Sequence, residues 1–329
     1  MSHPQIIIPF ALPPAEHAKD LVKMLASEGA ADGLALLLAR NSSLLRTRQD
    51  DFSLALPHEV WLSNQQTQHQ QLSPLQQQAL RLGVQLQTGY WFMVNPVHLH
   101  IASNHLVLTD QRQLALSELH ATALFEKAQQ LCAEVDIELV YGNSSSWFLR
   151  ANSWSDFITS TPDAACGHNI EIWSVKGQQA LAWRKLQNEI QMEWFIHPLQ
   201  QQREQQGLTT INGVWLWAGS QMVDEFPQPT PQPAPLINAT DVETFIQSPG
   251  LIVLDQLSSA ALASDWGTWA AQLIELDHDW IAPVCRSLKN RQLNQCQLLL
   301  SNTTSLVNIN ATALALHKFW RAPTFKLLA

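Results

Sequence analysis

The sequence predicts an α/β protein in which helices cover the faces of a sheet. Short apolar runs of strand length alternate along the chain with longer segments whose apolar residues recur at three- and four-residue spacing. Hydrophobic residues make up 46% of the 329 residues and charged residues only 14%. This composition provides a generous core, and the length allows two compact domains of ordinary size or one large one.

The first 84 residues predict one buried strand and several helical segments. Residues 6–12 form a short apolar run, and residues 16–25 place their apolar side chains on one helical face. Residues 63–78 are rich in glutamine and weakly patterned, so we expect a surface loop that runs into a helix from about Pro74. We assign residues 1–84 to the N-terminal part of an outer lobe.

Residues 85–222 form the second predicted module. Period-two alternation over residues 89–108 indicates a two-stranded unit, with a turn at Asn95-Pro96 and a hairpin bend at Asn104. A long amphipathic helix is expected over residues 114–135. Two strands then follow, near residues 137–141 and 147–150.

The end of this module predicts a second long helix and a strand. The helix runs over residues 178–196 and should break at His197, because Pro198 restricts the residue before it to extended conformations. A further helical turn is expected to end at Gly207. Residues 211–218 are nearly all apolar, which is typical of a strand buried on both faces and central in its sheet.

A proline-rich segment separates this module from the end of the chain. Residues 227–235 read Pro-Gln-Pro-Thr-Pro-Gln-Pro-Ala-Pro and predict an exposed, extended stretch, so we place a linker at residues 223–235. Residues 236–329 should complete the outer lobe. Its expected elements are a buried strand at 250–254, a helix at 266–288 with a break near Pro283, a hairpin at 297–309 and a last helix at 311–320.

Charge and cysteine content exclude several classes of protein. There are 19 basic and 28 acidic residues, which leaves few cations to build the basic face that nucleic acid requires. The four cysteines lie far apart and form no C-x-x-C pair of the zinc or thioredoxin kind. No window is apolar over about 18 residues. We expect a reduced, cytoplasmic protein with no cofactor, no nucleic-acid partner and no membrane segment.

Two groups of residues have the composition of metal or proton-transfer sites. His98 and His100 lie two apart on a predicted strand and project from the same face, a spacing that metals use, but no acid lies nearby in sequence. Asp277, His278 and Asp279 are consecutive, and on a helix they point about 100° apart. We expect ordinary packing for the histidines, a solvated face for the acidic cluster, and no metal site.

The segment around residues 183–220 places polar residues in apolar surroundings. Asn212 interrupts a buried strand, so its amide needs a hydrogen-bond partner, and Arg203 near a helix end presents a planar fork suited to a carboxylate or phosphate. These residues either pair with one another and pin the helix to the sheet, or they bind a ligand. The candidate ligand-binding residues are Arg203, Asn212, His197, Asn188, Glu189 and Trp217.

The same segment carries a family resemblance. His197-Pro198-Leu199-Gln200, Arg203, Gly207 and residues 211–219, Ile-Asn-Gly-Val-Trp-Leu-Trp-Ala-Gly, resemble a stretch of archaeal-type cofactor-independent phosphoglycerate mutases. The whole chain, including Gly89-Tyr90-Trp91 and the closing Phe319-Trp320-Arg321, is similar to bacterial proteins described as RpfE-type regulatory or phosphoglycerate mutase-like. The resemblance implies an alkaline-phosphatase-like sheet with helical layers and an inserted smaller α/β lobe.

The resemblance does not extend to the catalytic residues of the mutases. Those enzymes need an Asp-Gly after the first strand, a Ser or Thr nucleophile, and Asp and His ligands for two metals. Here residues 6–12 run into Pro13-Pro14, Gln200 replaces the asparagine of the family, and Asp277-His278 lies in a helical pattern. We therefore expect no catalytic turnover of phosphoglycerates.

Three functions remain open on this sequence. The first is binding of a small anionic or phosphorylated ligand without a complete two-metal site, in a regulatory role. The second is an active phosphomutase or phosphatase with a rearranged metal site, and the third is a protein-interaction scaffold. A polar cleft that holds the Arg203 guanidinium would favour the first, clustered acids and histidines the second, and an exposed apolar patch the third.

Overall fold

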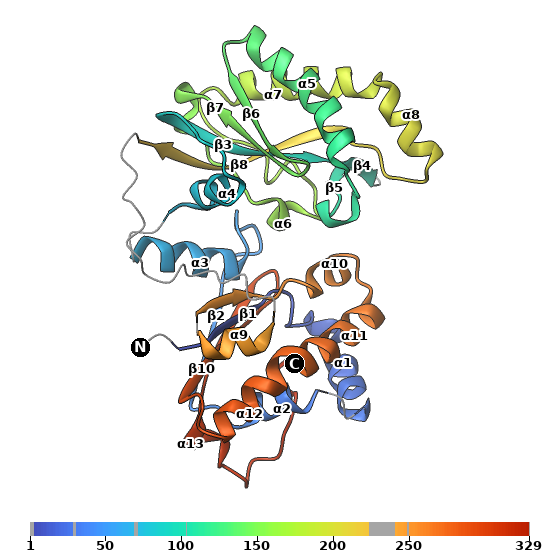
Figure 1. Ribbon diagram of the computed structural model, residues 1–329. Helices are drawn as coiled ribbons and strands as arrows, with labels where there is room; N and C mark the ends of the chain where they lie inside the picture. Colours follow the sequence, from blue (N-terminus) through green and yellow to red (C-terminus); the bar gives the residue numbers. More distant parts are fainter. Residues whose placement is uncertain are drawn as a thin grey trace. The chain divides into compact units, whose positions relative to one another are not determined.

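The computed structural model describes residues 3–28, 31–68, 72–102, 104–223, 241–248 and 250–328. The chain divides into two compact units. The outer unit comprises Met1–Asp51, Leu56–Glu59 and Pro229–Ala329. The inserted unit comprises a short segment, Phe52–Ala55, and a long one, Val60–Gln228. The predicted α/β class, with sheets covered by helical layers, is confirmed (Figure 1).

The outer unit is built on a five-stranded mixed sheet with the order β2-β11-β10-β1-β9. β1 pairs in parallel with both β9 and β10, whereas β11 is antiparallel to β10 and β2. Its strands are β1 (Gln5–Ile8), β2 (Ser43–Arg48), β9 (Leu251–Val253), β10 (Gln295–Ser301) and β11 (Ser305–Thr312). Its helices are α1 (Ala15–Glu28), α2 (Asp32–Ala39), α9 (Val242–Gln247), α10 (Leu257–Leu262), α11 (Trp266–Leu276), α12 (Ala282–Lys289) and α13 (Ala313–Leu316).

The inserted unit is built on a four-stranded antiparallel sheet with the order β6-β7-β3-β8, beside a separate β4-β5 hairpin. Its strands are β3 (Gly89–Val97), β4 (Leu99–Ala102), β5 (His105–Leu108), β6 (Glu138–Asn143), β7 (Ser146–Arg150) and β8 (Gly213–Met222). Its helices are α4 (Pro74–Leu82), α5 (Glu118–Glu134), α6 (Pro162–Ala165), α7 (Ala180–Phe195) and α8 (Pro198–Gln205). The chain enters this unit for the second time within α3 (Pro57–Gln68).

Both faces of the inserted unit's sheet are packed. Along β3, Phe92 and Val94 contribute to a core on the side of α5 and α7, and the alternate residues Trp91 and Met93 contribute to a second core on the side of α4. Figure 1 shows these helices on opposite faces of the sheet. The period-two alternation of this strand therefore reflects burial on two different apolar surfaces.

α4 lies in the inserted unit, whereas the sequence boundary at residue 84 assigns it to the outer lobe. The helix begins at Pro74, as predicted, and Ser73 caps it: Gln76 N–H donates to Ser73 Oγ, and Gln76 Oε1 accepts from Ser73 N–H. Leu75 and Ala79 pack against the sheet of the inserted unit, and this burial makes the helix part of that unit. Residues 63–68, predicted as loop, continue α3.

β8 is an edge strand, so the prediction that residues 211–218 lie centrally in their sheet is wrong. The strand is apolar because α7 and α4 cover its two faces, not because it has strands on both sides. Part of its open edge is occupied by a side chain, since Gln187 Nε2 donates to the Val214 carbonyl oxygen at 2.8 Å. Burial on both faces and a central position are thus separate properties.

Asn95-Pro96, predicted as a turn, lies within the continuous strand β3. Proline has no N–H to donate, which suits only a position without a partner on that side. β3 pairs with β7 only as far as Val94, and Pro96 faces Val214 of β8 on its other side. The missing donor therefore leaves no hydrogen bond of the sheet unmade, and the strand continues.

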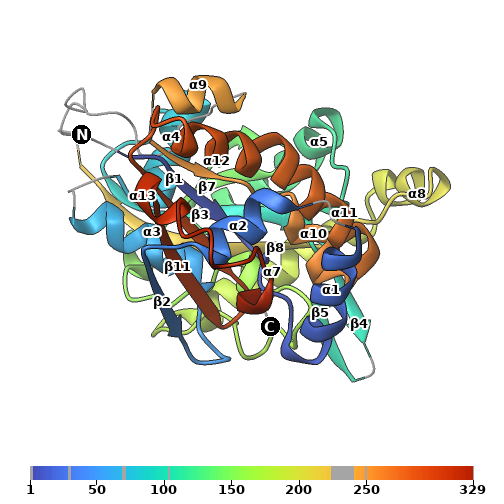
Figure 2. The same ribbon diagram turned by 90° about the horizontal axis from the view of Figure 1, so that it is seen from below.

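The predicted helix at 266–288 is divided by a π-helical turn, Asp277–Ile281, between α11 and α12. Figure 2 shows α11 and α12 following one another along the outer unit. The last helix is shorter than predicted, because α13 ends at Leu316. The proline-rich residues 227–235 lie outside the described residues. No helix in the described part of the chain combines the length and apolarity needed to cross a bilayer.

Candidate functional site

Arg203 lies near the end of α8 with its side chain 0% exposed. Its Nε donates to the Thr209 carbonyl oxygen at 2.8 Å, its Nη2 to the Leu114 carbonyl oxygen at 2.5 Å, and its Nη1 to Nδ1 of His120 at 3.2 Å. Burial lowers the pKa of the guanidinium, since none of these partners carries a negative charge. Arg203 therefore ties α8 to two neighbouring loops and does not present its fork to a cavity.

Asn212 forms a separate set of contacts at the start of β8. Its Oδ1 accepts from the Leu99 N–H at 2.7 Å, and its Nδ2 donates to the Leu99 carbonyl oxygen at 2.8 Å. The backbone N–H of Asn212 donates to the Val97 carbonyl oxygen. Arg203 and Asn212 thus share no hydrogen-bond partner, and each holds a different segment of backbone.

Gln200 makes the link between helix and strand that the sequence led us to expect of Arg203 and Asn212. Its Oε1 accepts from the Ile211 N–H at 3.0 Å, and its Nε2 donates to the Ile211 carbonyl oxygen at 2.6 Å. The side chain is buried within α8. Its position in the resembling motif, where the mutases have asparagine, is the signal that could have identified it.

Two of the four other candidates, His197 and Trp217, also have structural roles. His197 caps α8, because its Nδ1 accepts from the Leu199 N–H at 3.2 Å. The Trp217 indole N–H donates to Oδ1 of Asn95, whose amide in turn donates to the Ser145 carbonyl oxygen at 2.5 Å. These contacts join β8 to β3 and β3 to the β6–β7 turn.

Glu189 lines a pocket of about 750 Å³ in the inserted unit. The pocket is bounded by α7, by the segment that enters β6, and by the residues that follow β7. Both polar and apolar residues line it. Its lining includes Asp136, Glu138, Arg150, Asn152, Trp154, Gln179, Lys185, Leu186 and Glu189.

Two ion pairs contribute to this lining. On the sheet, Arg150 Nη1 lies 3.2 Å from Oε2 of Glu138, and on α7, Lys185 Nζ lies 3.8 Å from Oε1 of Glu189. Both pairs are partly exposed, so each contributes little to stability. Their charged atoms remain accessible to a third group that enters the pocket.

Gly89 leaves the space in which Arg150 lies. Its φ of +151° is a conformation that favours glycine, and a Cβ at this position would lie 2.5 Å from Nε of Arg150 and 2.8 Å from Oδ1 of Asn152. Asn152 Oδ1 also accepts from the Tyr90 N–H at 2.7 Å. The start of β3 thus fixes two side chains of the pocket wall.

Asn188 lines a second pocket, of about 470 Å³, on another flank of α7. Three indoles contribute to its wall, but Trp173, Trp183 and Trp215 are each at least nine-tenths buried and offer little ring face to a ligand. Adjacent helix positions point about 100° apart, and Asn188 and Glu189 accordingly line different pockets. The six candidate residues are therefore not brought together in one site.

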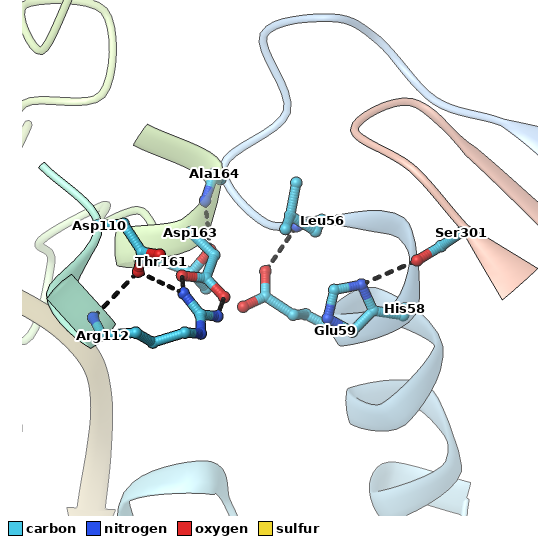
Figure 3. Close-up of polar contacts among 9 residues, drawn as sticks. All are labelled: Leu56, His58, Glu59, Asp110, Arg112, Thr161, Asp163, Ala164 and Ser301. Carbon is cyan, nitrogen blue, oxygen red and sulfur yellow. Dashed lines mark hydrogen bonds and ion pairs between the residues drawn. The ribbon is translucent and has the colours of Figure 1, made fainter. Parts of the chain in front are cut away.

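An Arg-Asp cluster that the sequence analysis did not single out lies beside β5 (Figure 3). Arg112 donates to both carboxylate oxygens of Asp163, at 3.0 and 2.5 Å, and to Asp110 at 2.7 Å. Burial opposes the charge of the guanidinium, but these carboxylates outweigh it and raise the pKa of Arg112 above its ordinary value. Thr161 caps α6 from the same loop. The cluster clamps α6 to the end of β5, and the Asp-x-Arg spacing is the only sequence signal for it.

The residues at the carboxyl ends of the parallel strands do not fit a two-metal centre, although ligands of open α/β sheets bind there. After β1 the chain continues with Phe10, Ala11 and Leu12, all buried. At the last residue of β10, the Ser301 hydroxyl forms a 3.2 Å hydrogen bond with His58 Nδ1 (Figure 3). Among the described residues, no group of three or more His, Cys, Asp or Glu side chains could hold a metal ion. No phosphoryl-transfer step follows from these residues.

His98 and His100 stack on each other, with ring centroids 6.1 Å apart. Their Nδ1 atoms are hydrogen-bonded to the Thr210 carbonyl oxygen at 2.9 Å and to Thr109 Oγ1 at 3.1 Å. Burial is the main reason why the pKa of His98 is lowered. The pair packs as the sequence analysis expected.

The Asp277–Asp279 cluster is split between the interior and the surface. Asp277 is buried and accepts from the N–H groups of Gly33 and Leu34, at 3.2 and 2.5 Å, whereas His278 and Asp279 are exposed and pair with each other. Burial raises the pKa of Asp277, against the opposing effect of the two N–H groups. The predicted solvated face is correct for the last two residues and wrong for Asp277.

The comparisons with known proteins assign no family to this chain. No protein-family model matches the chain, and no curated protein matches it. Two solved structures align with most of it. One is a cofactor-independent phosphoglycerate mutase from Thermoplasma acidophilum DSM 1728, with 10% identity, 95% of this chain and 90% of that chain covered, and a TM-score of 0.40. The other is the PH0037 protein from Pyrococcus horikoshii, with 11% identity, coverage of 95% and 88%, and a TM-score of 0.45.

Proposed function

We propose that this chain is a small-molecule binding protein whose ligand occupies the pocket between α7 and the β6–β7 strands. The observation that carries this proposal is that two ion pairs, Arg150–Glu138 and Lys185–Glu189, line one pocket from a sheet and a helix. Its volume of about 750 Å³ suits a small ligand, for which pockets of roughly 300–1,000 Å³ are typical.

The charges of the pocket narrow the chemical class of the ligand. Arg150 and Lys185 suit a carboxylate or a phosphate, and Arg150 can bind it through two N–H groups. Asp136, Glu138 and Glu189 supply three acids beside these two cations. A polyanion would be repelled by the acids, so the ligand we propose is a small zwitterion that carries a carboxylate or phosphate together with an amine.

A role in metal-dependent phosphate transfer has less support. The segment that carries the resemblance to the mutases uses Arg203, Gln200 and Asn212 to hold backbone, and the ends of β1 and β10, within the described residues, carry no metal-ligand set. We expect no manganese-dependent interconversion of 2- and 3-phosphoglycerate. A turnover that a single Asp or His substitution abolishes would restore the mutase hypothesis.

The test is calorimetric titration of the full chain with O-phosphoserine, phosphoethanolamine, glycine and 3-phosphoglycerate. We expect the zwitterions to bind more tightly than 3-phosphoglycerate, which has no amine to offer the acids. Lys185→Ala should weaken phosphoserine binding about tenfold, the loss of one charge-assisted contact. Arg184→Ala is the matched control, because this neighbouring exposed cation does not line the pocket.

Two results would overturn the proposal. One is that none of the four probes binds in the millimolar range. The other is that a probe binds equally well to the wild-type chain, to Lys185→Ala and to Glu189→Gln, since the ligand would then occupy another surface.

A further inference from the structure

β2 forms an open edge of the five-stranded sheet in the outer unit. Among the described residues it has a neighbouring strand on one side only, β11, and all six of its residues, Ser43–Arg48, are exposed. Figure 2 shows β2 beside β11. An exposed edge strand presents backbone N–H and C=O groups that no strand pairs with, so another extended chain can add to it.

The pairing register shows which backbone groups of β2 face this open edge. The Gln49 N–H, directly after the strand, donates to the Thr304 carbonyl oxygen of the β10–β11 turn at 2.8 Å. Alternate residues of an antiparallel strand exchange hydrogen bonds with one neighbour, and the residues between them point the other way. The N–H and C=O groups of Leu44, Arg46 and Arg48 therefore point toward the open edge.

Cations gather around β2, although the chain as a whole carries a net charge of −9. Four basic side chains join the segment around β2 to the end of the chain by donating to backbone carbonyl oxygens: Arg40, Arg46, Lys318 and Arg321. A carbonyl oxygen has no net charge, and in the described part of the chain none of the four forms an ion pair with an acid. Arg48 pairs with Asp51 at 3.4 Å, but both side chains are more than half exposed, so this pair is weak. The edge of β2 thus lies in a region of excess positive charge.

We propose that β2 binds an acidic segment of a partner protein as an added strand of the sheet. In this mode of recognition, backbone hydrogen bonds along the edge supply affinity and alternate side chains supply specificity. Arg46 and Arg48 lie two apart and project from the same face, so the added strand needs acidic residues at two alternate positions. Leu45 projects from the other face and is 62% exposed, which favours apolar residues at the positions between and beside the acids.

The chemistry of the edge favours a peptide over other anions and over a second copy of this chain. Its C=O groups alternate with N–H groups and need donors, which a peptide backbone has. The phosphate groups of a nucleic acid or of an anionic membrane offer acceptors only. β2 reads Ser-Leu-Leu-Arg-Thr-Arg, with two cations and no acid, so two copies of it would meet with charges of the same sign.

The experiment is a fluorescence anisotropy titration of the full chain against a labelled synthetic peptide, Thr-Val-Glu-Val-Glu-Val-Thr. The peptide reads the same in both directions, so it fits a parallel or an antiparallel added strand. We expect saturable binding with a dissociation constant below about 1 mM. The same peptide with Gln in place of both Glu residues should bind about tenfold more weakly or worse, because both cross-strand ion pairs are lost.

N-methylation of the peptide tests whether it binds as a strand. Every second N–H of an added strand points toward β2, and the N–H groups between them point away. We compare one isomer methylated at the two Glu nitrogens with another methylated at two of the Val nitrogens. Their affinities should differ about tenfold or more, since only one isomer loses hydrogen bonds to the edge.

Substitutions in the protein test the two cations of the strand. Arg46→Gln and Arg48→Gln should each weaken binding of the acidic peptide about tenfold, because each removes one charge-assisted contact. Arg46 also donates to the Leu327 carbonyl oxygen, whereas the partner of Arg48 is exposed, so the Arg48 variant separates loss of charge from loss of packing. Arg286→Gln is the matched control, because this exposed cation lies on α12 of the same unit, outside the segments joined at β2.

Three outcomes of the peptide titrations would overturn this inference: no binding of the acidic peptide below about 1 mM, equal affinities of the two methylated isomers, or an unchanged affinity in Arg48→Gln. Tighter binding of a thymidine oligonucleotide or of phosphatidylserine vesicles, lost in Arg48→Gln, would assign the edge to a phosphate ligand instead. A concentration-dependent dimer that the peptide dissociates would assign it to a second copy. None of the substituted residues lines the pocket proposed for the small ligand, so failure of this inference and failure of the ligand proposal are distinguishable.

Discussion

Arg203 is a buried cation that donates to two carbonyl oxygens and one imidazole. Charge-assisted hydrogen bonds repay part of the free energy lost when the guanidinium leaves water, and truncation would leave the two carbonyl groups without this donor. The arrangement stabilises the junction of α8 with the loops around it. These contacts explain why Arg203 is buried, and no ligand is required.

Arg203→Ala should lower the free energy of unfolding by about 3 kcal/mol, because it removes three hydrogen bonds and leaves buried polar atoms behind. Urea denaturation followed by tryptophan fluorescence measures this loss. Arg184→Ala, at an exposed position, should stay within about 0.5 kcal/mol of the wild-type chain. Equal urea midpoints for the two variants would contradict the structural role of Arg203.

Gly89→Ala should cost about 2 kcal/mol and should weaken phosphoserine binding, because the added Cβ forces Arg150 out of place and adopts an unfavourable φ. Gly83→Ala is the matched control. Gly83 also has a positive φ, of +68°, but beyond its chain neighbours no atom lies within 4 Å of the point that a Cβ would occupy, so only the conformational penalty of about 1 kcal/mol applies. Equal losses in stability and no change in binding would argue against the close approach.

At the scale of elements, the π-helical turn between α11 and α12 explains how the Asp277 side chain reaches α2. Pro283 has no N–H to donate, so the regular ladder is interrupted there, and the Ala282 N–H instead bonds to the Asp277 carbonyl oxygen. The wider turn directs the Asp277 carboxylate to the first N–H groups of α2. This explains why Asp277 is buried while the next two residues are exposed.

Asp277→Ala should lower the free energy of unfolding by about 2 kcal/mol, because α2 loses the acceptor for two of its N-terminal N–H groups. Asp279→Ala, two residues later and exposed, should change it by less than about 0.5 kcal/mol. Thermal denaturation of both variants checks this difference. A loss of the same size in Asp279→Ala would show that helix charge, and not the capping contact, is responsible.

Periodicity predicted the position of most elements but not their surroundings. Residues 211–218 read as buried on both faces, and the structure confirms a strand there, yet helices supply the burial and the strand lies at the edge. The π-helical turn at Asp277 could not be predicted either, since a consecutive Asp-His-Asp run gives no sign of one. The local pattern indicates how much surface a segment buries. Long-range packing determines which elements cover that surface.

At the scale of the whole molecule, both ends of the chain build the outer unit and its middle builds the inserted unit. The sequence analysis proposed an outer lobe formed by residues 1–84 and 236–329, and it predicted that polar residues near α7 and α8 need partners. It could not separate residues that bond to backbone, such as Arg203, from residues that line a pocket, such as Glu189, because that depends on the loops before α5 and β6. Arg150 and Lys185 were missed since each looks like an ordinary surface cation.

Three histidines of the inserted unit make its stability depend on pH. Burial is the main reason why the pKa values of His98, His120 and His168 lie below their ordinary value of 6.5. The Arg203 guanidinium adds to this effect at His120, where Nδ1 accepts a hydrogen bond and must stay unprotonated. In each case the unfolded chain binds a proton more readily than the folded chain does.

The contribution of these three histidines to the free energy of unfolding should therefore be fully present above about pH 6.5. It should fall as the pH drops below that value, because protons then bind preferentially to the unfolded chain. Urea denaturation at pH 7.5 and at pH 5.5 measures the fall. His120→Gln keeps an acceptor for Arg203 but cannot be protonated, so it should reduce the fall, whereas His278→Gln, at an exposed position, should leave it unchanged. Identical acid sensitivity in His120→Gln and the wild-type chain would show that the contact with Arg203 tolerates a protonated imidazole, and the acid response would then have to come from other groups.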